Sequence, residues 1–111
     1  MRLNVDLSVF ALPAHAVGRV HGAIDLEVVP RQGELIGFTF PNNGVLPLNI
    51  PSYPHQLRVE QVLHSPKALA EQVTLMIEPL TLNSIAEARS VMEFLEKGFG
   101  LYSDEYLQDE T

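Results

Sequence analysis

The chain of 111 residues contains no cysteine, only seven lysine and arginine residues, and no long apolar run. Without cysteine it has no disulfide, no thiolate nucleophile and no zinc site built on sulfur. Its formal net charge of −7 argues against nucleic acid as a partner, because that binding depends on lysine and arginine neutralising phosphates. The apolar stretches are too short for a membrane span, and Asn4, Asp6 and Ser8 interrupt any secretory signal at the amino terminus. We therefore expect a soluble, cytoplasmic protein that does not bind membranes.

Motifs for catalysis or cofactor binding are also lacking. No serine stands in the G-x-S-x-G context of a hydrolase nucleophile. The "GFG" at Gly98 follows the expected helix, whereas a phosphate-binding loop would precede one. The sequence therefore predicts no catalytic residue, no metal and no cofactor, and it favours a protein that is not an enzyme.

Alternation of polar and apolar residues predicts the first strands. Residues 2–10 alternate strictly, and a second alternation covers residues 19–28. The turn residues Pro30 and Gly33 then favour a hairpin whose return strand is 34–40. In that hairpin Ile36, Phe38 and Phe40 would share the buried face, and Gly37 suggests a bulge or a close approach by another element.

Two further strands follow the middle of the chain. Residues 56–64 start as an alternation whose phase slips, which predicts a β-bulge near Glu60 and Gln61. Residues 65–71 suggest a turn or a short helical turn. The fifth strand is expected over 72–80, with its apolar face formed by Val73, Leu75 and Ile77.

One helix is expected, over residues 84–98. Ser84 and Glu87 have the spacing of a capping box. An apolar stripe follows at helical spacing, and Gly98 is a natural stop. The last segment, 101–111, reads as an acidic tail that Tyr102, Tyr106 and Leu107 could attach to the body of the protein.

Together these elements predict one α+β domain over residues 1–111. About five mostly antiparallel strands form a curled sheet or small barrel, with one C-terminal amphipathic helix at 84–98. A single helix of this length cannot cover one face of such a sheet. The remainder is closed by curling, by the middle loop, or by a second copy of the chain.

The histidines and carboxylates suggest a possible polar site formed by Asp25, Glu27, His55 and His64. Asp25 and Glu27 would lie about 6.6 Å apart along a strand, within the range of paired carboxylates in glycoside cleavage. His21 lies about 13 Å from Asp25, too far to share an ion with it. Cross-strand charge pairs and solvated loop residues are the simpler interpretation.

The proline-rich loop 41–55 is longer than the usual connection and has no periodicity. Its apolar residues are unsuited to a segment that stays in water, and its prolines favour an extended, stiff conformation. It either forms a lid over the domain's own core or contacts another chain. The candidate interaction residues are Val45, Leu46, Leu48, Ile50 and Tyr53.

The sequence therefore favours a non-catalytic protein-interaction or assembly module, most simply a homo-oligomer that uses loop 41–55. One alternative is a small ligand-binding protein or enzyme with a site near the mouth of this loop. Another is an acidic inhibitor or immunity-type partner of a basic protein, suggested by the net charge of −7.

Overall fold

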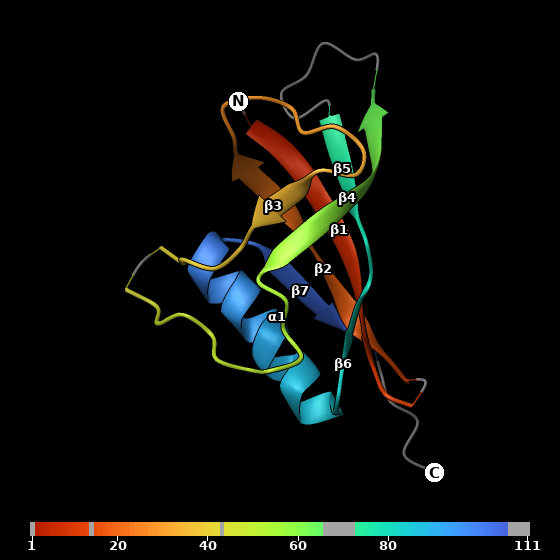
Figure 1. The fold of residues 1–111 in the computed structure, drawn as a ribbon, viewed down its shortest axis with the longest axis vertical. Helices are drawn as coiled ribbons and strands as arrows, with labels where there is room; N and C mark the ends of the chain where they lie inside the picture. The colour runs from red at the N-terminus through yellow and green to blue at the C-terminus, as the bar shows by residue number, and fades with distance from the viewer. Residues whose placement is uncertain (1, 14, 43, 66–72, 107–111) are drawn as a thin grey trace.

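Strand β1 (Arg2–Ala11) lies at the centre of the sheet (Figure 1). The computed structural model describes residues 2–13, 15–42, 44–65 and 73–106. As the alternation predicts, Leu3, Val5, Leu7 and Val9 are buried and the residues between them face outward. Strand β2 (His15–Asp25) returns antiparallel along β1, from Ala11↔His15 to Arg2↔Asp25.

The remaining strands extend this pair on both sides. They are β3 (Leu35–Gly37), β4 (Gln56–His64), β5 (Val73–Ile77), β6 (Leu80–Leu82) and β7 (Tyr102–Glu105). Their order is β3-β4-β5-β1-β2-β7, and β6 continues along the edge of β1 beyond β5. Only the β1–β5 and β1–β6 pairs are parallel among the described strands. The prediction of an α+β fold with a mostly antiparallel, curled sheet is confirmed, but the sheet is not closed into a barrel and has seven described strands where about five are expected.

The predicted hairpin between residues 19–28 and 34–40 is wrong. Strand β2 pairs with β1 and β7, whereas β3 pairs with β4. Residues 26–34 instead arch over the end of the sheet, and their turn does form, with the Glu34 N–H donating to the Arg31 carbonyl oxygen at 3.1 Å (Figure 1). Strands β1 and β2 are long and follow one another closely in the chain, and their mutual pairing satisfies far more backbone groups than pairing with the three-residue strand β3 could.

Two side-chain predictions for β3 also need correction. Ile36 and Phe38 are buried, but Phe40 is 81% exposed because strand pairing ends before it. Gly37 is neither bulged nor approached closely, since a Cβ placed there would meet no atom within 4 Å. The alternation therefore predicted the buried face correctly at Ile36 and Phe38, but not at Phe40, which lies beyond the end of the strand.

Strands β4 and β5 agree with their sequence patterns. The register between them shifts between Val59 and Gln61, which confirms the predicted bulge. Leu75 and Ile77 are buried and Val73 is half-buried. The predicted turn at 65–71 lies almost wholly outside the described residues.

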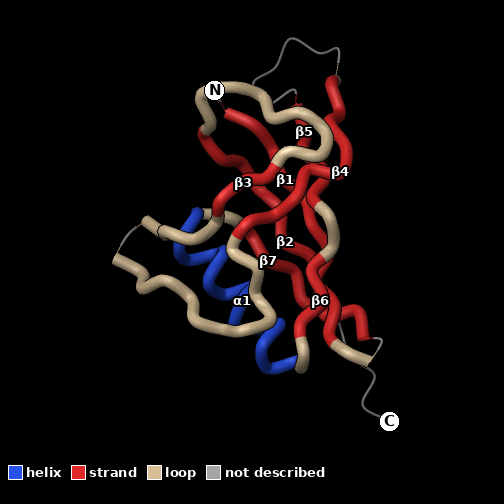
Figure 2. The backbone as a smooth tube through the Cα atoms, in the orientation of Figure 1, coloured by secondary structure: helices blue, strands red, loops and turns tan. Residues whose placement is uncertain are grey.

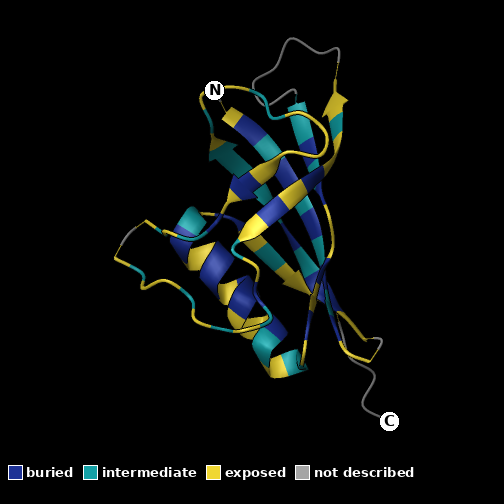
Figure 3. Cartoon of the chain, viewed as in Figure 1, coloured by how far each residue is buried: buried dark blue, intermediate teal, exposed yellow. Residues whose placement is uncertain are grey.

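Helix α1 (Ile85–Phe99) packs on β1, β2, β6 and β7 through its apolar stripe (Figure 3). The Ser84 side chain caps it as predicted, since its Oγ accepts from the Glu87 N–H at 3.1 Å. The helix ends one residue later than predicted, and its cap is Gly100, in the left-handed conformation at φ 72°. Gly98 therefore lies inside the helix, and Pro41 packs against it so closely that no room is left for a Cβ.

Residues 101–105, predicted as part of an acidic tail, belong to the fold. Residues Tyr102–Glu105 form the edge strand β7, and Leu101 before them is buried. Tyr102 and Tyr106 are exposed, and Leu107 lies outside the described residues. A four-residue strand with two acidic residues carries little pattern, so its pairing with β2 was not predicted.

Within the described residues, no helix is both long and apolar enough to cross a membrane.

Candidate functional site

Loop 41–55, which we call the arm, folds back onto its own helix (Figure 2). At one end the Asn42 N–H donates to the Gly98 carbonyl oxygen at 2.7 Å, next to the Pro41–Gly98 contact. At the other end the Ser52 hydroxyl donates to Glu87 Oε1 at 2.7 Å. Because Gly98 and Glu87 lie at opposite ends of α1, the arm runs along the helix in the opposite direction.

Tyr53 is the main anchor of the arm. Its side chain is 2% exposed, and its hydroxyl donates to the Phe38 carbonyl oxygen at 2.7 Å. Its ring meets Phe94 of α1 edge-on, with the ring centroids 5.7 Å apart. Burial raises the pKa of the Tyr53 hydroxyl above its ordinary value. Tyr53, a candidate interaction residue, therefore contacts the chain's own core.

His55 ends the arm in a strained conformation. Its φ of 65° is left-handed, and its carbonyl oxygen accepts from the Phe38 N–H at 2.7 Å. Its ring centroid lies 4.7 Å from that of Tyr53, and its Nδ1 is buried without a partner among the described residues. These contacts turn the chain from the arm into β4.

The other candidate residues of the arm lie above the helix. Val45, Leu48 and Ile50 are half-buried against the core, whereas Leu46 is 82% exposed. A groove of about 360 Å³ separates the arm from α1. It is lined by Val45, Leu46, Leu48, Ser90, Glu93, Phe94 and Lys97. We call this groove, together with the exposed side chains of Phe40 and Leu46, the arm–helix surface.

The possible polar site of Asp25, Glu27, His55 and His64 is spread over the sheet. Asp25 pairs with Arg2 at 3.1 Å. His64 pairs in register with Val73, so three strand spacings of about 4.8 Å, roughly 14 Å in all, separate it from the end of β2. His55 precedes the opposite end of β4, about 30 Å from His64 along the strand. The described residues contain no group of three or more histidine, aspartate or glutamate side chains that could hold a metal ion.

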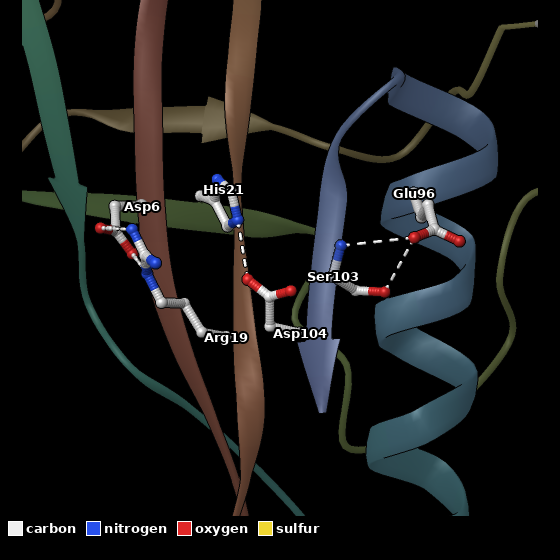
Figure 4. Close-up of polar contacts among 6 residues, drawn as sticks. All are labelled: Asp6, Arg19, His21, Glu96, Ser103 and Asp104. Carbon is white, nitrogen blue, oxygen red and sulfur yellow. Dashed lines mark hydrogen bonds and ion pairs between the residues drawn. The ribbon is translucent and has the colours of Figure 1, made fainter. Parts of the chain in front are cut away.

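A polar cluster on the outer face of the sheet was not predicted (Figure 4). Arg19 of β2 donates to both carboxylate oxygens of Asp6 on β1, at 2.9 and 2.8 Å. His21 Nε2 lies 3.0 Å from Asp104 Oδ2 on β7. The hydrogen bond to Asp6 raises the pKa of Arg19. The pairing of β1 with β2 would have revealed Arg19–Asp6, but Asp104 lies in the segment that reads as a tail.

The chemistry of this outer cluster is that of cross-strand charge pairs. A histidine held by a carboxylate could orient a proton-transfer group, as general-base sites do. Here, however, the neighbouring hollow is small, about 280 Å³, and the carboxylates of Asp6 and Asp104 each have one cross-strand partner on an open sheet face. Such pairs each stabilise a sheet by about 0.2–1 kcal/mol. The cluster therefore fastens β7 to β2 and β2 to β1.

Comparisons with protein-family models, with curated proteins and with solved structures find no match to this chain. The geometry of the chain alone therefore directs any functional inference.

Proposed function

We propose that the protein is a non-catalytic assembly module that binds a second copy of itself through the arm–helix surface. The observation that carries this proposal is the exposure of Phe40 and Leu46, at 81% and 82%. These are the two most exposed large apolar side chains of the described residues, they lie six residues apart in the chain, and Leu46 lines the apolar groove. Clustered apolar exposure of this kind is typical of protein contact sites.

The shape of this surface suits a two-fold dimer. In such an interface the same patch serves both copies, so it must offer a projecting group and a hollow that receives it. Phe40 and Leu46 project, and the groove lined by Val45, Leu48 and Phe94 is hollow. A groove of about 360 Å³ has room for one large apolar side chain from a partner.

The charge of the chain opposes this contact. Two copies each carry −7, so their long-range repulsion weakens association at low salt and is screened at physiological ionic strength. Self-association should therefore strengthen as salt is added. An acidic inhibitor that binds a basic protein would show the opposite dependence.

Sedimentation velocity tests the proposal over protein concentrations from about 10 μM to about 1 mM, at low and high salt. We expect a concentration-dependent dimer that salt stabilises and that Leu46→Asp abolishes. Val28→Asp is the matched control, because Val28 is 71% exposed but lies between β2 and β3, away from the arm. A monomer at every concentration, or equal loss of dimer in both variants, would contradict the proposal.

A further inference from the structure

The curled sheet leaves an open seam between β2 and β3. Strand β2 pairs with β7 only as far as His21↔Tyr102, so its last residues have no strand on that side within the described chain. Strand β3 is the opposite edge of the sheet and pairs only with β4. Two adjoining hollows, of about 350 and 660 Å³, lie along this seam and share Leu26, Ile36 and Gly37. Because these residues line both hollows, we describe the two together as the seam groove.

The free backbone groups of β3 follow from its pairing with β4. The Phe38 N–H donates to His55 and the Val59 N–H donates to Glu34, so Glu34 and Phe38 face β4. In an antiparallel pair every second residue directs its N–H and C=O groups away from the partner strand. Counting from Glu34 and Phe38, these residues are Leu35 and Gly37, and both line the seam groove. Within the part of the chain that the structure describes, the groove therefore presents unpaired backbone N–H and C=O groups at Leu35 and Gly37.

The side chains around the seam groove are suited to an extended chain. Ile24, Phe38 and Phe99 line one end, and Leu26, Val28 and Leu35 line the other. Val28 and Leu35 are 71% and 48% exposed. Strand addition uses this combination, in which edge hydrogen bonds hold the peptide backbone and hollows receive alternate side chains. Val28 and Pro30, from the segment that follows β2, line the groove together with β3, so it is bounded on two sides, which favours a single strand over the folded edge of another domain.

The charges of the groove identify the kind of peptide. Arg2 pairs with Asp25, and Arg58 with Glu78. Glu27 and Glu34, which also line the groove, have no cationic partner in the described chain. We propose that the seam groove binds an extended peptide segment of another protein, with apolar residues alternating with lysine or arginine, as an added strand along β3. This groove meets the arm only at Asn42 and shares no lining residue with the groove between the arm and α1, so the proposal does not depend on self-association.

A titration with synthetic peptides tests this proposal, with amide NMR of the full chain as the readout. One ten-residue peptide alternates valine and lysine, and its control alternates valine and glutamate. We expect the lysine peptide to shift the Leu35 and Gly37 amides, to slow their hydrogen exchange, and to bind at least about tenfold more tightly than the glutamate peptide. Glu27→Gln with Glu34→Gln should remove most of that difference.

Gly37 offers a matched pair of variants. Gly37→Pro removes the N–H that faces the groove but leaves the neighbouring bonds to β4, and an edge strand tolerates proline at such a position. Gly37→Ala retains the N–H, and its Cβ enters open space. We expect Gly37→Pro to weaken lysine-peptide binding about tenfold and Gly37→Ala to leave it within about twofold.

Three results would overturn the strand-addition proposal. The lysine peptide could cause no shift at about 1 mM, or shifts confined to the arm. Both peptides could bind equally well, which would remove the charge basis. The Leu35 and Gly37 amides could become protected on concentrating the protein without peptide, which would show that a second copy occupies the groove.

Discussion

The β1–β2 hairpin and the arm are held in place by different physical means. In the hairpin, the alternation in β1 puts a continuous row of buried side chains such as Leu7 and Val9 on one face. Backbone hydrogen bonds between β1 and β2 hold the two strands together. The arm has no period, and a few directed contacts hold it, chiefly those of Asn42, Ser52 and Tyr53. Burial shared over many residues makes the hairpin robust, whereas the arm depends on single groups.

Core truncation in the hairpin should have the largest effect. Leu7→Ala removes a buried side chain from the centre of β1 and leaves a cavity, so we expect the free energy of unfolding to fall by about 2–5 kcal/mol. Urea unfolding measures it. Ser8→Ala, on the outer face, should change the free energy of unfolding by no more than about 0.5 kcal/mol. Equal effects of the two substitutions would contradict the assigned faces.

The Tyr53 hydroxyl should be the most important polar contact of the arm. Tyr53→Phe keeps the ring contacts but removes the donor to the Phe38 carbonyl oxygen, so we expect a loss of about 1–3 kcal/mol. The buried neutral hydroxyl has a pKa raised above 10.0. Its stabilising contribution should therefore be complete below pH 10.0 and be lost as the pH rises above it.

Unfolding followed against pH in wild type and Tyr53→Phe checks this sign. The difference between the two proteins should be constant near neutral pH and change only above about pH 10. A difference that instead changed between pH 5 and 8 would contradict the assignment to the Tyr53 hydroxyl.

The Pro41–Gly98 contact should determine the sign of a smaller change in stability, that of Gly98→Ala. An alanine Cβ at position 98 would lie 2.5 Å from Pro41 Cβ. The clash, costing about 1–3 kcal/mol, opposes a gain of about 1 kcal/mol in helix propensity, so Gly98→Ala should destabilise by about 1 kcal/mol. In a Pro41→Gly background the same substitution should stabilise. Thermal unfolding of the four proteins gives the sign, and an effect independent of residue 41 would show that the arm is not seated there.

The smallest effect should come from the outer cluster. Arg19→Ala removes a pair with Asp6 that is partly exposed, and we expect a loss of about 0.2–1 kcal/mol that shrinks at high salt. Urea unfolding at two salt concentrations measures it. A loss above about 2 kcal/mol, unchanged by salt, would mean that this pair is a structural centre.

Local sequence patterns predicted the individual strands and the helix far better than they predicted which strands pair with each other. The phase slip at Gln61 is a property of adjacent residues, so the bulge could be predicted, and so could the Ser84 cap. Alternation tells which side chains turn inward but not which strand lies alongside, so β3 was assigned to the wrong partner. The strand β7 was missed because its polar residues carry no inward stripe.

The candidate site could be predicted only in outline. The apolar, proline-rich composition of 41–55 marked it as a segment that must contact something. Its anchors join residues far apart in the sequence, such as Ser52 with Glu87, and no local pattern encodes them. Glu87 has two roles, since its backbone N–H donates to the capping Ser84 side chain and its carboxylate accepts from the Ser52 hydroxyl.

The most direct test of the proposed assembly is a series of amide NMR spectra of the wild-type chain on dilution from about 1 mM to about 20 μM. We predict that shifts are concentrated at Phe40, at residues 44–48 and on the Ser90–Lys97 face of α1, and that Leu46→Asp shows none of them. Spectra that do not change on dilution, or shifts centred on β3 or β7, would contradict the claim that the arm–helix surface joins two copies.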